Sequence, residues 1–159
     1  DMGVLKVSRR VHASTEEAWK VVADVQHYSE YAPNLSASHV VTGTGVGMQR
    51  SCSNLKGESW IEECTLWEDG SRYSFRVDTS SYPYPIERMQ GTWSVEDASG
   101  GALITMQFEY RMKYGIVGRA VGFVLRPWFK HISAQLLDRW QVAIERGAAP
   151  AARPKLHRA

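Results

Sequence analysis

Two oppositely charged residues are spaced so that they can meet across a hairpin. Arg50 and Glu62 lie on either side of residues 54–57, whose Asn-Leu-Lys-Gly sequence is typical of a tight turn. If the hairpin pairs Asn54 with Glu58, the antiparallel register places Arg50 directly opposite Glu62. A guanidinium beside a carboxylate can hold a ligand oxygen or take part in acid–base chemistry.

The neighbours of this pair predict which way it points. Trp60, Cys64 and Leu66 alternate with outward positions on the second strand of the hairpin, so Arg50 and Glu62 are expected to face the interior with them. Opposite charges inside a protein need each other or water, which favours a polar anchor for a ligand carbonyl or hydroxyl. A slip of one residue would turn both side chains to solvent, and the sequence leaves that alternative open.

A second candidate for acid–base chemistry is His131. It lies four residues before Gln135, beside Trp128 and Ile132, in a segment with helical spacing. A histidine near an apolar pocket can move protons, although an exposed or hydrogen-bonded histidine fits the same pattern. Four tyrosines offer hydroxyls to a ligand or else belong to the core or its rim: Tyr73, Tyr82, Tyr84 and Tyr110.

No motif for a metal, a nucleotide or a nucleophilic triad is present in the sequence. Residues 43–47 (GTGVG) lead into a strand rather than a helix, which disfavours a phosphate-binding loop. Cys52 and Cys64 form no CxxC pair, have no histidine at zinc-ligand spacing, and do not face each other in the hairpin register. We expect free thiols, as in a cytosolic protein, and neither a metal nor a cofactor.

Length and charge restrict the class of protein further. The 159 residues indicate one domain, residues 2–146, followed by a flexible basic tail at 147–159. Four of the 19 basic residues follow Glu145, so residues 1–145 carry 15 basic and 17 acidic side chains. A body with this balance argues against nucleic-acid binding. No apolar run could span a bilayer and no signal peptide is recognised, so we expect no stable membrane insertion and a cytoplasmic location.

Hydrophobic periodicity predicts an α+β fold. A strand at 4–12 precedes a helix capped by Ser14, with Glu17 at capping-box spacing, and a second short helix at 27–31. Alternation and turn residues then predict a meander of six strands at 35–41, 48–54, 58–68, 72–78, 86–95 and 103–112. Together they form a curved antiparallel sheet of about seven strands.

A long helix at 114–145, bent at Pro127, is the only remaining element long enough to cover that sheet. Its large or apolar residues recur in steps of three and four: Val121, Leu125, Trp128, Ile132, Leu136, Trp140 and Ala143. Side chains from this stripe and from the inner faces of the strands are the predicted ligand contacts: Tyr73, Phe75, Met89, Trp93, Met106, Phe108, Tyr110, Trp128, Ile132 and Gln135. We also expect helix residues 118–126 to move with the loop at 79–85 as a gate.

Three stretches resemble a known superfamily. Residues 11–33 (VHASTEEAWKVVADVQHYSEYAP), residues 91–110 (from GTWSV to ITMQFEY) and the long C-terminal helix are similar to the START-like, or SRPBCC, helix-grip proteins. The YGIVG sequence at 114–118 and Pro127 resemble the polyketide cyclase/dehydrase-like branch. The segment at 23–33 is also similar to coenzyme-Q-binding chaperones.

The resemblance implies a helix-grip fold with an apolar cavity between sheet and helix, in which members bind lipids, sterols, polyketides or plant hormones. Some members are cyclases or hydrolases, and in aromatic polyketide cyclases arginines inside the cavity are thought to act on the substrate. Arg50 is the only inward arginine predicted on the middle strands. We therefore expect binding of a small hydrophobic or aromatic molecule of lipid, polyketide or quinone type. The alternative is a cyclase or dehydratase using Arg50, Glu62, Tyr73 or His131, and a protein-interaction role is a third class.

Overall fold

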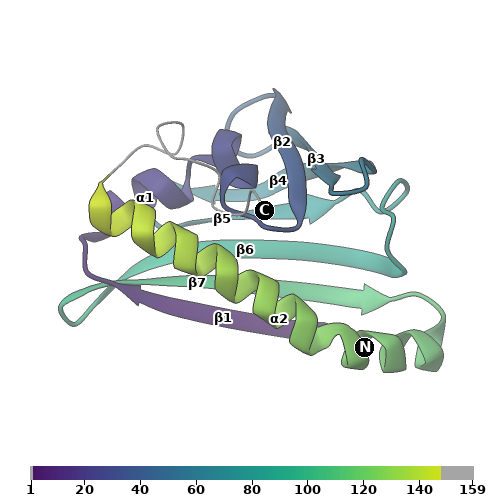
Figure 1. Cartoon of the computed structure of the whole chain (residues 1–159). Coiled ribbons are helices and arrows are strands. Elements are labelled where there is room, and N and C mark those ends of the chain that lie inside the picture. Colours follow the sequence, from purple (N-terminus) through teal and green to yellow (C-terminus); the bar gives the residue numbers. More distant parts are fainter. Residues whose placement is uncertain (1, 148–159) are drawn as a thin grey trace.

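The structure is a computed structural model that describes residues 2–147. Seven strands and three helices follow one another along the chain (Figure 1): β1 (Gly3–Val11), α1 (Thr15–Val22), η1 (Val25–Glu30), β2 (Leu35–Thr42), β3 (Gln49–Asn54), β4 (Ser59–Glu68), β5 (Arg72–Val77), β6 (Ile86–Ala98), β7 (Gly101–Met112) and α2 (Gly115–Arg146). This order confirms the predicted helix-grip fold. Residues 148–159 of the predicted basic tail lie outside the described residues.

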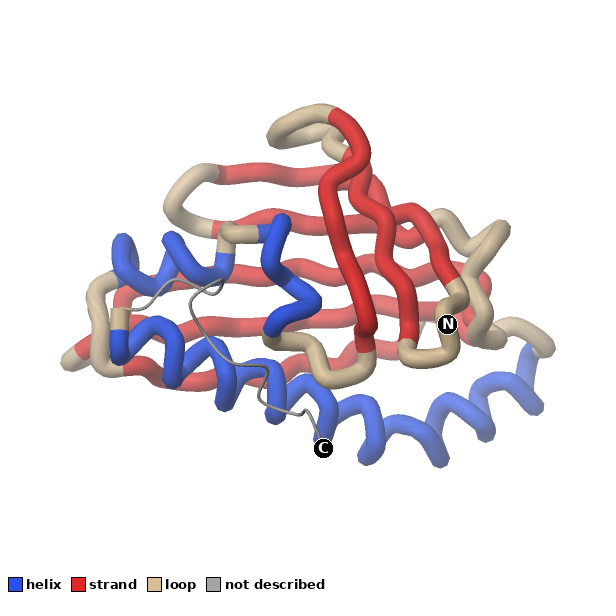
Figure 2. Tube along the Cα trace, turned by 45° about the horizontal axis from the view of Figure 1, so that its top comes forward, coloured by secondary structure: helices blue, strands red, loops and turns tan. Residues whose placement is uncertain are grey.

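The strands form one antiparallel sheet in the order β1-β7-β6-β5-β4-β3-β2. Short connections join consecutive strands from β2 to β7. The first strand, β1, lies at the edge of the sheet opposite β2 and pairs with β7 from Gly3↔Tyr110 to Val11↔Ala102. The predicted inner face of β6 is confirmed, because alternate residues from Met89 to Val95 are buried. On β4 a register shift after Cys64 packs Trp67, instead of the predicted Leu66, against the core. The sheet curves around its helical cover (Figure 2).

The first helix begins where its capping residues predict. Ser14 accepts a hydrogen bond from the backbone N–H of Glu17, and the Glu17 carboxylate accepts one from the N–H of Ser14. Both bonds satisfy donors that the first helical turn cannot pair internally. The following 3-10 helix η1 starts two residues before the predicted second helix. It buries Val25 and Tyr28 under the sheet.

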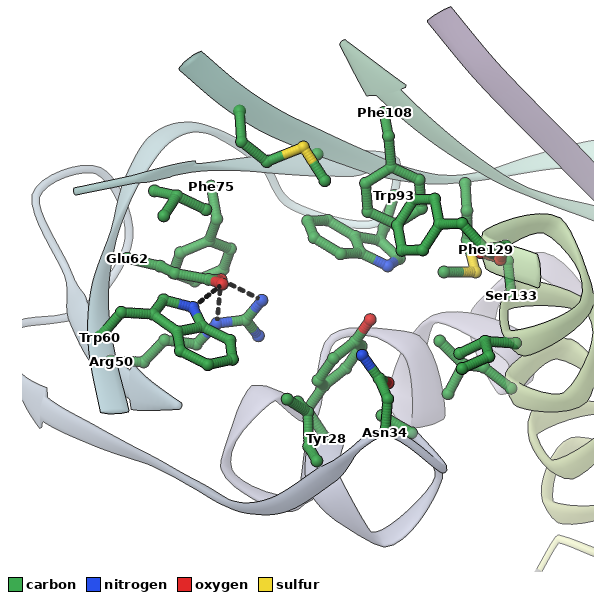
Figure 3. A pocket seen from close by; sticks show the side chains of 18 of the residues that line it. Tyr28, Asn34, Arg50, Trp60, Glu62, Phe75, Trp93, Phe108, Phe129 and Ser133 are labelled. Carbon is green, nitrogen blue, oxygen red and sulfur yellow. Dashed lines mark hydrogen bonds and ion pairs between the residues drawn. The ribbon is translucent and has the colours of Figure 1, made fainter. Parts of the chain in front are cut away.

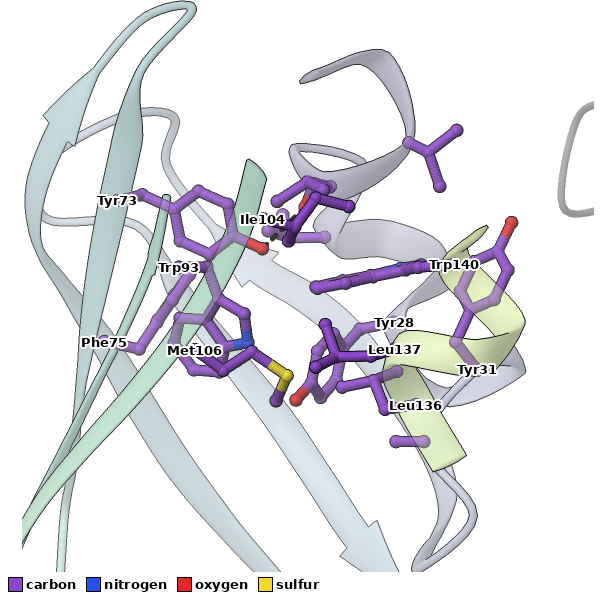
Figure 4. Packing of buried hydrophobic residues seen from close by; sticks show 14 of the residues in the cluster. Tyr28, Tyr31, Tyr73, Phe75, Trp93, Ile104, Met106, Leu136, Leu137 and Trp140 are labelled. Carbon is purple, nitrogen blue, oxygen red and sulfur yellow. Dashed lines mark hydrogen bonds between the residues drawn. The ribbon is translucent and has the colours of Figure 1, made fainter. Parts of the chain in front are cut away.

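The C-terminal half of α2 closes the core. Leu136, Leu137, Trp140, Ala143 and Ile144 are buried against the sheet and α1. Figure 4 shows Trp140 and Leu137 pointing from the helix toward the sheet, with the rings of Tyr28 and Tyr31 beside Trp140 at centroid distances of 6.0 and 6.4 Å. This half of the helix therefore covers the apolar face of the sheet, as its predicted apolar stripe indicated.

The predicted stripe is wrong for the N-terminal half of α2, where Val121, Leu125 and Trp128 are exposed. The buried side of this half consists of Gly118 and Gly122 instead. A Cβ atom on Gly118 would overlap the carbonyl oxygen of Lys113, and one on Gly122 would lie 3.0 Å from Met112 Cγ. Backbone packs here where larger side chains would not fit, so the large residues of the stripe turn outward.

The helix continues through Pro127 as one element. Its direction nevertheless changes along its length in both overall views (Figures 1 and 2), in agreement with the expected bend. A salt bridge of 2.6 Å between Arg9 and Asp138 fixes the straight C-terminal part to β1. The helix therefore has a part that covers the sheet and a part that extends beyond that cover.

Candidate ligand-binding cavity

Two adjoining cavities lie between the sheet and α2. The inner cavity, about 70 Å³, reaches from α2 to the β3–β4 hairpin, and the outer cavity, about 120 Å³, lies under the N-terminal half of α2. Asn34, Tyr82, Met89 and Phe129 border both and form the partition between them. Typical ligand pockets measure about 300–1,000 Å³, so aromatic side chains fill most of this interior. A sizeable ligand would have to displace the partition.

The inner cavity ends at the predicted charge pair. Arg50 pairs with Glu62 in the register expected from the hairpin, and both side chains point inward (Figure 3). The Nε and Nη2 atoms of Arg50 donate to Glu62 Oε1 at 3.0 and 2.8 Å, and Trp60 Nε1 donates to Glu62 Oε2 at 2.8 Å. Both carboxylate oxygens are therefore occupied by protein donors, and Glu62 serves to hold Arg50 in place.

Aromatic rings enclose the guanidinium of Arg50. Its Cζ atom lies 4.0 Å from the ring centroid of Phe75, 4.7 Å from that of Tyr28 and 5.4 Å from that of Trp93. Cation–π attraction and the nearby carboxylate compensate for the loss of water around a side chain that is only 1% exposed. Burial is the largest single influence and would lower the pKa of Arg50, but Glu62, together with weaker interactions with Cys52 and nearby tyrosines, raises that pKa on balance. Arg50 is thus a permanent cation.

One donor of Arg50 has no partner among the described residues. Its Nη1 atom is buried and makes no hydrogen bond, although the other two guanidinium nitrogens are bonded to Glu62. Leaving a charged donor unpaired in the interior is costly, which favours an oxygen acceptor at this end of the inner cavity. This geometry suits a ligand carbonyl, phenolate, enolate or carboxylate.

The other titratable groups near Arg50 are held neutral. Burial raises the pKa of the Cys52 thiol and of the Tyr28 and Tyr82 phenols well above their ordinary values. The Arg50 charge and the indole N–H of Trp93 act against burial at Tyr28 without reversing it. These groups can donate or accept hydrogen bonds, but none is a ready general base at neutral pH.

The structure brings together most of the predicted contact residues. Six line the inner cavity: Phe75, Met89, Trp93, Met106, Phe108 and Ile132. Met89, Tyr110 and Trp128 line the outer cavity. Whether they touch a ligand stays a prediction.

Three predicted site residues do not border either cavity. Tyr73 is fully buried in the core, stacked on Trp67 and Trp93, and its hydroxyl donates to the Val22 carbonyl oxygen at 2.6 Å. Gln135 is half-buried on a flank of α2, and His131 is exposed. Both lie off the helix face that looks into the cavities, because Ile132, Ser133 and Leu136 occupy it.

Sequence reasoning missed several wall residues. Tyr28, Asn34 and Leu35 come from η1 and the connection to β2, whose path between helix and strand has no periodic signal. Ser133 and Phe129 were not predicted as wall residues because the apolar stripe was defined by the residues next to them in the sequence. Tyr28 had a signal, since it lies inside the predicted short helix at 27–31 and its large aromatic side chain is most readily buried.

Residues 79–85 and the N-terminal half of α2 border the same cavity, as the predicted gate requires. Tyr82, Tyr84 and Pro85 face Gly122 and Leu125 across the outer cavity. Lys113 donates its backbone N–H to the Pro85 carbonyl oxygen at 2.9 Å, which ties the base of the loop to the start of the helix. Their joint movement stays a prediction.

Residues 2–147 contain neither a metal-binding cluster nor a membrane-spanning helix. In that range no three histidine, cysteine, aspartate or glutamate side chains gather closely enough to bind a metal ion. None of the helices there is both long and apolar enough to pass through a bilayer.

Comparison with solved structures shows the fold. The chain is similar to the ZhuI aromatase/cyclase from Streptomyces sp. R1128, with 14% identity, 97% of this chain and 100% of that chain covered, and a TM-score of 0.77. It is also similar to TTHA0849 from Thermus thermophilus (17% identity, 92% and 100% covered, TM-score 0.74). Norcoclaurine synthase from Thalictrum flavum, solved with dopamine and hydroxybenzaldehyde, gives 16% identity, 94% and 90% coverage and a TM-score of 0.71.

No curated protein matches the chain by sequence. One family profile does match, over residues 2–145, and its description is polyketide cyclase / dehydrase and lipid transport. With the helix-grip neighbours, this match makes the cavity between sheet and helix a binding site for a small hydrophobic molecule. The chain belongs to the polyketide cyclase / dehydrase and lipid transport family.

Proposed function

We propose that residues 2–146 form one ligand-binding domain that holds a small aromatic or polyketide- or quinone-like molecule carrying an oxygen acceptor. The ring system lies among Trp93, Phe108 and Met106, and the oxygen accepts a hydrogen bond from Arg50 Nη1. The observation that carries this proposal is the buried, unpaired Nη1 donor at the end of a mainly apolar cavity. The two free, buried cysteines favour a cytosolic location.

The small volumes support a ligand that enters by displacing the partition residues. Phe129 packs edge-on against Phe108 at a centroid distance of 4.9 Å and borders both cavities. Rotation of this one side chain would join the two cavities. The end of the inner cavity at Arg50 would then bind the polar group of the ligand. The outer cavity would hold an apolar part of the same ligand.

A second candidate function is a cyclase or dehydratase acting on the same ligand. Arg50 would stabilise the enolate oxygen that forms when a carbon next to a carbonyl loses its proton. The observation that favours it is the same fixed cation, because a donor pre-placed at a developing negative charge lowers a barrier. The neutral tyrosines and the fully occupied carboxylate of Glu62 offer no evident base, so ligand binding is the better supported function.

A ligand pair that differs by one oxygen tests the role of Arg50. We expect 2-naphthol and 1,4-naphthoquinone to bind more tightly than naphthalene in isothermal titration calorimetry. An Arg50→Lys variant keeps the charge beside Glu62 but loses the guanidinium fork. It should lose about tenfold in affinity for the oxygenated ligands, equivalent to about 1.4 kcal/mol, and keep its affinity for naphthalene.

The matched control is Arg76→Lys on β5, two strands away from Arg50 in the sheet, because Arg76 is exposed and forms only a 3.9 Å contact with Glu63. It should bind all three ligands as the wild type does. Equal affinity of the wild type for naphthalene and naphthol would refute the Arg50 anchor. Native mass spectrometry of protein purified from its host should also show a bound molecule. No bound mass together with no heat from any aromatic ligand would refute binding altogether.

A further inference from the structure

The N-terminal half of α2 presents an apolar face to solvent. Ile116, Val117, Phe123 and Val124 are 65–78% exposed, and Trp128 is 54% exposed. At about 100° per residue, these side chains and Ala120 fall on the side of the helix opposite Gly118 and Gly122, which pack on the protein. We call this surface the docking face. An ordinary surface helix buries its apolar side, and this segment does the reverse.

Basic residues run along one edge of the docking face. Arg119, Arg126 and Lys130 are seven and four residues apart, which places them in one row on a flank of the helix. No acidic residue occurs from Tyr110 to Leu137, a stretch that also contains Arg111 and Lys113. An apolar face with tryptophan and phenylalanine beside a row of cations is the pattern of helices that lie in a membrane interface.

The docking face adjoins the mouth of the outer cavity. Trp128 and Leu125 are exposed and at the same time line that cavity, together with Arg126 and Gly122. In Figures 1 and 2 no other helix or strand covers the side of this half of α2 that faces away from the sheet. A lipid surface against the docking face would therefore meet the cavity opening, where an apolar ligand could pass without crossing water.

We propose that this half of α2 docks the protein reversibly on an anionic lipid bilayer, with the docking face in the interface and the cations at the headgroups. A second copy of the chain is the less favoured occupant. A two-fold dimer through this face would bring two basic rows together with no acidic residue between them. The proposal goes beyond cavity binding and does not depend on which molecule the cavity holds.

Vesicle sedimentation tests the proposal with the full chain and no added ligand. We expect the wild type to sediment with phosphatidylcholine vesicles containing about one third phosphatidylglycerol, and at least tenfold less with phosphatidylcholine alone. Raising the salt from about 0.1 M to about 1 M shortens the screening length from about 10 Å to about 3 Å and should release most of the protein.

Two variants separate the two parts of the surface. Phe123→Asp/Val124→Asp places charge in the docking face, and Arg119→Glu/Lys130→Glu reverses the basic row; each should lower partitioning about tenfold or more. The matched control is Val46→Asp, because Val46 is 66% exposed on the β2–β3 connection, at the opposite end of β3 from the Asn54–Tyr84 contact near the cavity mouth, and should bind as the wild type does. Thermal melts establish that all variants are folded.

Absence of wild-type binding to anionic vesicles at low salt would overturn the proposal, and so would equal losses in the Phe123/Val124 variant and the Val46 control. Analytical ultracentrifugation covers the other occupant. A wild-type dimer that Phe123→Asp/Val124→Asp converts to a monomer, without vesicle binding, would assign the face to a second copy instead.

Discussion

Replacing Glu62 by glutamine removes one charge from a buried pair and leaves the shape of the side chain unchanged. Glu62 accepts two hydrogen bonds from Arg50 on one oxygen and one from Trp60 on the other. The amide of glutamine has one acceptor and one donor end, so either Arg50 or Trp60 would face an N–H group. The variant thus loses the charge opposite Arg50 and creates a donor–donor contact.

The expected loss of stability follows from burial. Removing one member of a buried ion pair costs about 3–5 kcal/mol, because the remaining charge has no partner. Glutamine still accepts one hydrogen bond, so we expect about 3 kcal/mol. For a domain of this size that corresponds to a fall in melting temperature of roughly 6–12 °C.

Urea denaturation of Glu62→Gln measures this loss, with Glu63→Gln as the control. Glu63 is the next residue on β4, has a side chain that is 43% exposed, and lies 3.9 Å from Arg76, so its substitution should cost less than about 1 kcal/mol. An Arg50→Met/Glu62→Met double variant should regain part of the loss, because no buried charge is left. A cost below about 1 kcal/mol for Glu62→Gln would show that water, rather than Glu62, balances Arg50.

Three further predictions concern other parts of the molecule. Burial holds the pKa of Cys52, Tyr28 and Tyr82 above the unfolded values of about 8.5 and 10, so the folded state keeps protons that the unfolded state releases. Stability in urea should therefore be full below about pH 8 and fall as the pH rises beyond it, and a flat profile to pH 11 would contradict this assignment. Gly118→Ala should lower the melting temperature, because the Cβ of alanine would overlap the Lys113 carbonyl oxygen. This clash has to outweigh the helix propensity of alanine, which is about 1 kcal/mol more favourable than that of glycine. A higher melting temperature would mean that the helix can move away from Lys113. Tyr73→Phe should cost about 1–3 kcal/mol through the unpaired Val22 carbonyl and leave naphthol affinity unchanged, whereas weakened binding would place Tyr73 in the site.

The pairing of consecutive strands could be predicted because each strand has one solvent-exposed face and each turn is short. The Arg50–Glu62 register followed from a single hairpin turn and the period of two along its strands. The same alternation identified Met89, Trp93 and Phe108 as inward residues. Local rules sufficed wherever neighbours in the sequence are also neighbours in space.

The helix face was harder to predict because periodicity does not say which side a neighbour covers. Trp128 and Leu125 follow the same spacing as Leu136 and Trp140, yet the close approach of Gly118 to Lys113 turns the first pair outward. Tyr73 illustrates a related limit. Its inward position was predictable, but its hydrogen bond to Val22 depends on where α1 packs, which is a tertiary contact.

The pairing of β1 with β7 has a consequence for how the chain folds. About 90 residues of sequence separate these two strands, and both contact α2, which follows β7 in the chain. Closing so long a loop carries an entropic cost that only late contacts repay. During synthesis β1 therefore cannot pair with β7 until β7 has left the ribosome, and we expect β2 to β6 to collapse first. Hydrogen exchange during refolding should then protect β1 after β4 and β5, and simultaneous protection would argue against this order.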